Sequence, residues 1–298
     1  MNTILKKFEG FSYGLLSSIT FGLIPLFAVP IMASGMQFMS VLFYRFTLAS
    51  VALAIILTLR KETLKIKKSD FPALLLLSFL YLISSVFLLW GYLFMPSGVA
   101  TTIHFTYPII TTIMMMIFFH EKSTRLRIIA ILAAVAGVFF ISHTKEDTEF
   151  SWIGLGIVLL SGVGYAAYLV ALGQLRNIHI RGLKLTFYVF LFSSLFLLLL
   201  MTSTNSFQPI QNGQTALNLI MLAIIPTIIS NLSLIEAVKR IGSTKTSVLG
   251  AMEPLTAVSV SIFVFKDAFT LSIGIGIILI ISAVTIIILE HKPRDKRK

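Results

Sequence analysis

The chain has 298 residues, of which 57% are hydrophobic and only 12% are charged, and its mean hydropathy is +0.95. Because a soluble domain carries about 25% charged residues, this composition excludes a soluble globular protein and indicates an integral membrane protein. The chain has no cysteine, which excludes disulfides and thiolate metal sites, and its net charge is +12.

Apolar runs long enough to cross a membrane follow one another along the whole chain. About 20 apolar residues are needed to cross about 30 Å of hydrocarbon. The first run is too long for the apolar core of a signal peptide, so we interpret it as a retained helix. The predicted spans are 10–33, 36–59, 71–94, 97–119, 124–142, 151–173, 183–202, 215–238, 244–265 and 268–289. The predicted fold class is therefore an all-α integral membrane protein with ten transmembrane helices and no soluble domain.

Lysine and arginine lie almost entirely on one side of these predicted spans. The two termini and the loops after spans two, four, six and eight hold 21 of the 24, whereas the opposite loops hold only Lys145 and Lys266, and Arg45 lies inside the second span. Since positively charged loops remain in the cytoplasm, both termini are predicted to be cytoplasmic. The basic charge thus follows from membrane topology, with the bilayer as the partner, and does not indicate nucleic-acid binding.

Two segments of the chain repeat one pattern 146 residues apart. Pro108 opens an apolar run with Glu121 thirteen positions later, and Pro254 opens another with Asp267 thirteen positions later. Another apolar helix follows each. We therefore predict two repeats, 1–146 and 147–298, of five helices each. An odd number of spans makes the second repeat enter the membrane from the opposite side, which is the arrangement used for alternating access around a site between the repeats.

The residues around these prolines are similar to a known family. The segment GVATTIHFTYP (98–108) with Glu121, the segment SVLGAMEP (247–254) with Asp267, and Arg45 between Tyr44 and Phe46 resemble the drug/metabolite transporter superfamily, specifically its EamA-like ten-helix transporters. The resemblance covers nearly the whole chain. It implies a bacterial-type inner-membrane carrier that exports a small metabolite such as an amino acid. Asp267 departs from the glutamate of many members.

Polar side chains recur at helical spacing within several predicted spans. Polar groups are costly against lipid, so those at one helix face are expected to point into the bundle. The candidates for lining a central substrate cavity are Tyr81, Ser85, His104, Tyr107, Tyr165, Tyr168, Ser230, Asn231 and Glu253. The alternative for each serine is packing between helices, where small residues are common.

Three charged or titratable side chains are expected deep in the membrane. Glu253 lies about ten residues into its predicted span, about 15 Å deep at 1.5 Å per residue. It is a candidate for binding a substrate ammonium or a coupling proton, or for stabilising backbone groups freed by Pro254. His104 is a second coupling candidate, because imidazole titrates near neutral pH, or else a hydrogen-bonding residue. Arg45 would pair with a substrate carboxylate, or bond carbonyl groups and a partner such as Glu253.

Pro108 and Pro254 are predicted to break or bend their helices and so to take part in gating. The sequence has no HExxH-type metal spacing and no glycine-rich phosphate loop, so neither a metal, a cofactor nor nucleotide hydrolysis is expected, and no catalytic residue is assigned. A gradient-driven or proton-coupled carrier is the favoured function. A uniporter, an intramembrane enzyme and a non-transporting receptor remain alternatives, and the pattern carries no signal for the substrate, the direction or the oligomeric state.

Overall fold

The structure is a computed structural model that describes residues 2–95, 97–121, 124–142, 151–174, 180, 182–204, 207–264 and 271–289. Lys145, Lys266 and Asp267, which the sequence placed in loops on one side of the membrane, lie outside these ranges. The described residues form helices, turns and loops and contain no strand.

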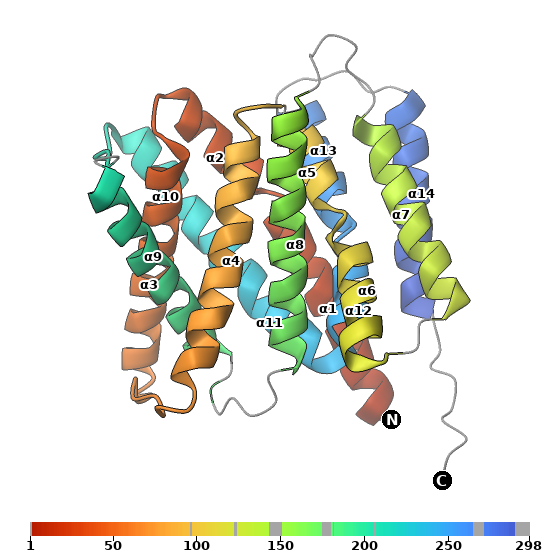
Figure 1. Cartoon of the computed structure of the whole chain (residues 1–298), viewed down its shortest axis with the longest axis horizontal. Coiled ribbons are helices and arrows are strands. Elements are labelled where there is room, and N and C mark those ends of the chain that lie inside the picture. Colours follow the sequence, from red (N-terminus) through yellow and green to blue (C-terminus); the bar gives the residue numbers. More distant parts are fainter. Residues whose placement is uncertain are drawn as a thin grey trace.

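The helices of the described residues are mostly apolar and range from 6 to 23 residues in length, and together they make an upright bundle (Figure 1). They are α1 (Asn2–Phe21), α2 (Ile24–Ala33), α3 (Phe38–Leu59), α4 (Phe71–Gly91), α5 (Ser97–His104), α6 (Tyr107–Phe119), α7 (Arg125–Ser142), α8 (Trp152–Gln174), α9 (Leu183–Thr204), α10 (Gly213–Ala223), the π-helix η1 (Ile224–Ile229), α11 (Ser230–Ile241), α12 (Ser243–Leu249), α13 (Met252–Phe263) and α14 (Leu271–Leu289).

Six stretches of the described chain are long and apolar enough to cross a membrane: 8–33, 38–59, 71–91, 152–174, 183–204 and 213–241. They coincide with six of the predicted spans. The other four predicted spans correspond to shorter or divided helices, α5 with α6, α7, α12 with α13, and α14. The prediction of an all-helical, multi-pass membrane protein is thus confirmed, and the total of ten spans stays a prediction.

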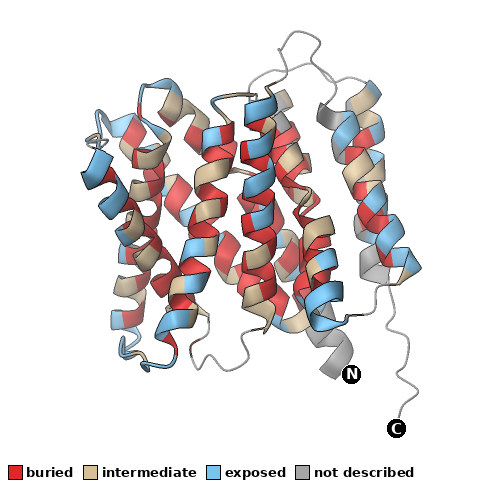
Figure 2. Cartoon of the chain, in the orientation of Figure 1, coloured by how far each residue is buried: buried red, intermediate tan, exposed pale blue. Residues whose placement is uncertain are grey.

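Exposure follows the pattern expected of a protein surrounded by lipid. Large apolar side chains point outward, among them Ile55, Phe79 and Leu199, whereas Arg45 and Glu253 are buried. Figure 2 shows the buried residues gathered on the inward faces of the helices and the exposed ones on the outside. Since the hydrocarbon phase offers no hydrogen bonds, polar groups are stable only where protein partners surround them.

Helices from the two halves of the chain pack against each other in pairs. The most extensive contacts join α7 with α14, α1 with α11, α4 with α8, and α3 with α9. The α7–α14 pair forms one edge of the bundle and α3, α9 and α10 form the opposite edge (Figure 1). Between these edges lie α1, α4, α8, α11 and the interrupted pairs α5 with α6 and α12 with α13 (Figure 1).

Two of the predicted spans are interrupted just before their prolines. The first ends as α5 at His104 and restarts as α6 at Tyr107; the second ends as α12 at Leu249 and restarts as α13 at Met252. Proline has no N–H to donate to the preceding turn, and its fixed φ suits the first turn of a helix. Each interruption places the end of one helix and the start of another inside the protein. Glu253 therefore lies in the first turn of α13, beside the break or bend that the sequence predicted at Pro254.

The start of α13 is also where α1 ends. A β-carbon at Gly22, between α1 and α2, would lie 2.5 Å from the backbone oxygen of Glu253 and 2.8 Å from the side chain of Thr256. Only glycine permits this approach of the two backbones. The end of α1 is thus held directly against the segment that carries Glu253.

A third proline produces the π-helix η1. Pro226 lacks the N–H that would otherwise donate to the carbonyl of Leu222, and the hydroxyl of Thr227 donates to that oxygen instead, at 2.7 Å. π-helical turns of this kind occur frequently at functional sites. Here the turn presents the Thr227 hydroxyl and the Pro226 carbonyl to the interior of the bundle.

Candidate functional site

One hydrogen bond joins the two interrupted helices at the centre of the protein. The Tyr107 hydroxyl donates to Oε1 of Glu253 at 3.0 Å, and the side chains are 1% and 3% exposed. Both residues belong to the first turn of a helix, α6 and α13 respectively. They are 146 residues apart, which is the offset between Pro108 and Pro254. Equivalent positions of the repeated pattern therefore contact each other.

Gly250 leaves room for this bond. A β-carbon at Gly250 would overlap the Tyr107 hydroxyl and lie 2.7 Å from the Cζ atom of the same ring. The backbone of Gly250 has φ −55°, a value that any residue adopts. Steric space, and not backbone conformation, is therefore what requires glycine here.

His104, the last residue of α5, is bound to α8. Its Nδ1 lies 2.9 Å from the hydroxyl oxygen of Ser161, and that hydroxyl donates to the carbonyl oxygen of Ser84 at 2.7 Å. Its Nε2 is buried and has no hydrogen-bond partner in the part of the chain that the structure describes. The imidazole ring is 5.3 Å from the ring of Tyr107 and 5.4 Å from that of Tyr165, centroid to centroid.

Four tyrosine rings, those of Tyr81, Tyr107, Tyr165 and Tyr168, form a continuous group that we call the tyrosine cluster. Tyr107 meets Tyr165 edge to face at 4.7 Å, Tyr165 stacks on Tyr168 at 6.2 Å, and Tyr168 meets Tyr81 edge to face at 5.1 Å. Phe21 of α1 stacks on Tyr165 at 5.7 Å. All four tyrosines are buried, so the cluster connects the Glu253 end of the interior with the Arg45 end.

Arg45 of α3 lies at the other end of the tyrosine cluster and is 1% exposed. Its Nε donates to the Thr227 hydroxyl at 2.6 Å, and its Nη2 donates to the Pro226 carbonyl at 3.4 Å and lies 3.5 Å from the Tyr81 hydroxyl. Its guanidinium carbon lies 5.5 Å from the centre of the Phe46 ring, within the range of a cation–π contact. Every one of these partners is uncharged.

Arg45 and Glu253 do not form an ion pair with each other or with any other charged side chain among the described residues. The ion pairs found there are Arg127–Glu121, Lys239–Glu236, Arg240–Glu9 and Arg240–Glu236. The pairing of Arg45 with Glu253, one of the alternatives from sequence, is therefore wrong for this conformation, and carbonyl and hydroxyl groups take its place. A buried ionisable side chain without a counter-charge is costly in a membrane, so both side chains are candidates for binding a ligand.

The remaining predicted site residues fall into two groups. Asn231 belongs to the interior network, because its Nδ2 donates to the Tyr81 hydroxyl at 2.8 Å and its Oδ1 accepts from Tyr168 at 3.4 Å. Ser230 instead donates to the carbonyl of Ser17 at 3.0 Å and so binds α11 to α1. Ser85 is buried one turn after Tyr81 on α4. Pro108 and Pro254 are buried in the first turns of α6 and α13.

Sequence reasoning missed Thr227 and Phe21 as parts of this interior. Thr227 holds Arg45, and the only local signal for it was the preceding Pro226. Phe21 looked like one of many apolar residues in the first span. Neither contact leaves a periodic trace in the sequence, because each joins helices that are far apart along the chain.

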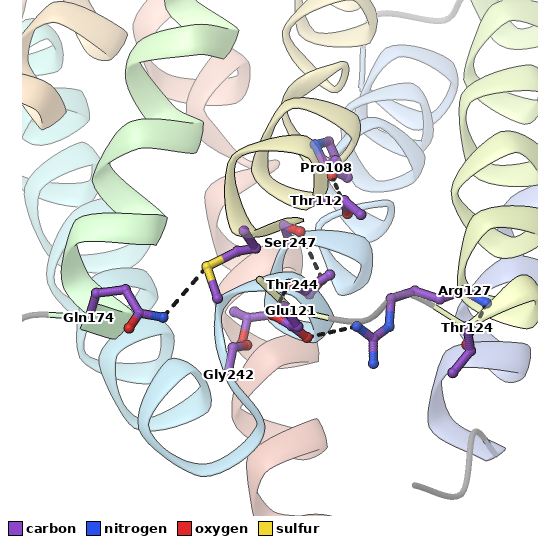
Figure 3. Close-up of polar contacts among 11 residues, drawn as sticks. Pro108, Thr112, Glu121, Thr124, Arg127, Gln174, Gly242, Thr244 and Ser247 are labelled. Atoms are coloured by element: carbon purple, nitrogen blue, oxygen red, sulfur yellow. Dashed lines mark hydrogen bonds and ion pairs between the residues drawn. The ribbon is translucent and has the colours of Figure 1, made fainter. Parts of the chain in front are cut away.

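A second polar cluster joins the two halves of the chain near one end of the bundle, the end where α1 begins. We call Glu121, Arg127 and Thr244 the Glu121 cluster (Figure 3). Oε1 of Glu121 accepts from Nη1 of Arg127 at 2.7 Å, and Oε2 accepts from the Thr244 hydroxyl at 3.0 Å. His120, with φ 53°, ends α6 and turns the chain toward Glu121. The backbone N–H of Arg127 is capped by the Thr124 hydroxyl at 3.1 Å. One carboxylate thus ties the start of α7 to the start of α12.

Loss of this carboxylate is expected to loosen that end of the bundle. Charge-assisted hydrogen bonds contribute about 1.5–3 kcal/mol, and about 1.4 kcal/mol corresponds to a factor of ten in a population. We expect Glu121→Gln to raise the rate of maleimide labelling at an introduced Ser247→Cys about tenfold. Ser247 is 1% exposed, and the chain has no cysteine of its own, so the label reports this site alone.

The matched control is Glu62→Gln, an exposed glutamate after α3, which should leave the labelling rate unchanged. Equal labelling rates in the Glu121→Gln protein and the parent would show that the Glu121 cluster does not hold this end closed.

No group of three histidine, cysteine, aspartate or glutamate residues suited to a metal ion occurs in the described ranges. The candidate site consists of hydrogen-bonded polar side chains, aromatic rings and the two buried ionisable residues Arg45 and Glu253.

Comparison with known proteins gives consistent matches. The sequence profile of the EamA-like transporter family matches residues 9–143 and again residues 152–289. A protein of Bacillus subtilis (strain 168), "Uncharacterized transporter YetK", is 25% identical over 293 residues, which are 94% of this chain and 84% of that protein. An "Uncharacterized transporter" of Archaeoglobus fulgidus is 33% identical over 125 residues, 42% of this chain and 43% of that one.

A solved crystal structure has the same fold. It superposes with a TM-score of 0.78 at 15% sequence identity, covering 93% of this chain and 95% of its own. At this identity, the likeness shows the fold alone.

Proposed function

This chain belongs to the EamA-like transporter family, and on that premise we propose that it is a secondary transporter that moves a small metabolite, such as an amino acid, across the cytoplasmic membrane by alternating access. Its membership, the transporter names of its relatives and its apolar helices make it a multi-pass membrane transporter. The substrate class, the coupling and the mechanism are the parts proposed here.

The observation that carries the proposal is the hydrogen bond from Tyr107 to Glu253 across the two interrupted helices. Broken helices at the interface of two repeats are where secondary transporters bind their substrates. The family profile matches the chain twice, once on each side of residue 147, which supports two repeats, 1–146 and 147–298. An ionisable side chain at their interface supports a binding or coupling role for Glu253.

The conformation described here fits a closed state of such a cycle. Tyr107, Glu253 and the rest of the tyrosine cluster are at most 3% exposed, so a solute reaches them only after helices separate. The Glu121 cluster would be one of the contacts that breaks, since it joins the two halves at the end predicted to be cytoplasmic. Pro108 and Pro254 supply the hinges, because each lies beside an interruption in its helix.

The proposed direction of transport follows from the family resemblance, and the proposed driving force follows from the chemistry of the buried side chains. Export is the direction that the family resemblance implies. The driving force would be the gradient of the solute itself or of protons, with Glu253 or His104 as the group that carries the proton. A uniporter of a small amphipathic solute is the alternative, and the buried side chains of Arg45 and Glu253 are compatible with both.

Counterflow in proteoliposomes tests the proposal. Vesicles containing the full chain are preloaded with a pool of amino acids and related metabolites, and uptake of each labelled compound is followed with and without a pH gradient. Saturable exchange of one compound is expected for a carrier. No exchange of any compound by folded protein would contradict carrier function.

Glu253→Gln separates coupled from uncoupled transport. The amide keeps a hydrogen-bond acceptor for Tyr107 but can neither carry a proton nor hold a negative charge. If Glu253 couples transport to protons, the variant should lose the effect of the pH gradient while retaining some exchange. An unchanged rate with an unchanged pH dependence would remove Glu253 from the coupling mechanism.

A further inference from the structure

We infer that His104 and Glu253, with the rings of Tyr107 and Tyr165, form a subsite that binds a protonated amine bearing at least one N–H group. The inference rests on the proposed function, since it names the part of the transported solute that this subsite holds. It depends on the unpartnered nitrogen of His104, on the carboxylate without a cation, and on the rings between them.

The hydrogen bonds around Ser161 determine which nitrogen of His104 carries the proton. A hydroxyl has one hydrogen to donate, and that of Ser161 goes to the carbonyl of Ser84 at 2.7 Å. The Ser161 oxygen must therefore accept from Nδ1–H of His104, 2.9 Å away. A neutral imidazole has a single N–H, so Nε2 presents a lone pair.

That lone pair has no donor. His104 is 0% exposed, and Nε2 has no partner among the described residues. Leaving a buried acceptor unsatisfied costs about 1–3 kcal/mol. A ligand that donates an N–H to this atom would recover that free energy on binding, whereas a ligand without a donor would not.

The neighbouring groups favour a cation as the donor. Two tyrosine rings lie against the imidazole, Tyr107 at 5.3 Å and Tyr165 at 5.4 Å between centroids, and tyrosine faces attract cations within about 6 Å. The hydroxyl of Tyr107 donates a hydrogen bond to the carboxyl group of Glu253. Glu253 has no lysine, arginine or histidine ion-pair partner among the described residues, as the ion pairs given above show.

The partial charges at the helix ends are compatible with the binding of a cation. Helix N-termini favour anions and C-termini favour cations. At each interruption an end of one kind meets an end of the other, α5 with α6 and α12 with α13. Their partial charges oppose each other, so the side chains decide which charge is bound, and the ionisable acidic side chain here is the carboxyl group of Glu253.

Three probes of similar size distinguish the elements of this subsite. Benzylamine carries a charge and N–H donors, benzyltrimethylammonium carries a charge without an N–H, and benzyl alcohol carries a donor without a charge. Binding of each is measured on the full chain in lipid nanodiscs by isothermal titration calorimetry. We expect benzylamine to bind at least tenfold more tightly than either of the others.

Substitution of His104 tests the role of Nε2. His104→Asn places an amide N–H where Nδ1–H was, so the bond to Ser161 is kept while the second acceptor is removed. It should weaken benzylamine at least tenfold and leave benzyltrimethylammonium unchanged. Ser161→Ala is the second variant, because it frees the imidazole proton to move to Nε2 and should weaken benzylamine several-fold. The control is Thr112→Val, because the Thr112 hydroxyl donates to the carbonyl of Pro108 and has no other hydrogen-bond partner among the described residues.

The outcomes separate this inference from the proposed function. Equal binding of benzylamine and benzyltrimethylammonium, or a His104→Asn protein that binds benzylamine like its parent, would overturn the subsite. Saturable counterflow of some solute without amine binding would support the proposed transport function and contradict the amine subsite. Amine binding with the expected pattern but without counterflow of any compound would support the subsite and contradict the proposed transport.

Discussion

Gly250→Ala is expected to lower counterflow at least tenfold and to destabilise the protein by about 1–3 kcal/mol, the usual cost of overpacking a well-packed interior. The added methyl group would overlap the Tyr107 hydroxyl, so the tyrosine must move away from Glu253. Transport then falls because the carboxylate loses its donor, and stability falls because the ring is displaced into the tyrosine cluster. Exchange rates in proteoliposomes and melting temperatures in nanodiscs measure the two effects.

Two further variants isolate the steric cause. The control is Gly156→Ala on α8, where an added β-carbon would have no atom within 4 Å. Because alanine in a helix is about 1 kcal/mol more favourable than glycine, this variant should not lose stability. Adding Tyr107→Phe to Gly250→Ala removes the overlapping hydroxyl and should restore part of the stability but none of the transport. A Gly250→Ala protein with the exchange rate and melting temperature of its parent would contradict the close approach.

Arg45→Lys is expected to have the second large effect, with a loss of about 2–3 kcal/mol in stability and at least tenfold in exchange. The guanidinium reaches the Thr227 hydroxyl and the Pro226 carbonyl from two nitrogens, which the single nitrogen of lysine cannot reproduce. One or more buried oxygens would then lack a donor, at about 1–3 kcal/mol each.

The control for Arg45→Lys is the same substitution at the end of the same helix. Arg60→Lys, at the exposed end of α3, should leave both the melting temperature and exchange unchanged. Thr227→Val should reproduce part of the Arg45→Lys effect, because it removes one acceptor and keeps the shape of the side chain. If Arg45→Lys melts and exchanges like the parent, Arg45 does not organise this end of the tyrosine cluster.

The membrane class, the family resemblance and six of the spans could be predicted from the sequence. They depend on local properties, namely the length of apolar runs, the position of Pro108 and Pro254, and the repetition of a pattern after 146 residues. The profile match across both halves confirms the resemblance. The division of the second run into α12 and α13 beside Glu253 agrees with the break or bend predicted at Pro254.

Only the tertiary structure decided which polar side chains meet. Tyr107 and Glu253 are 146 residues apart, Arg45 and Thr227 are 182 apart, and His104 and Ser161 are 57 apart. Each of these residues was free, on sequence grounds alone, to face packing partners or a substrate. Helix packing determines the choice, since a polar group that cannot turn to water or lipid must accept the partner that a neighbouring helix presents. Among the described residues, this packing leaves Nε2 of His104 without a hydrogen-bond partner and Glu253 without an ion-pair partner, which is the basis of the proposed subsite.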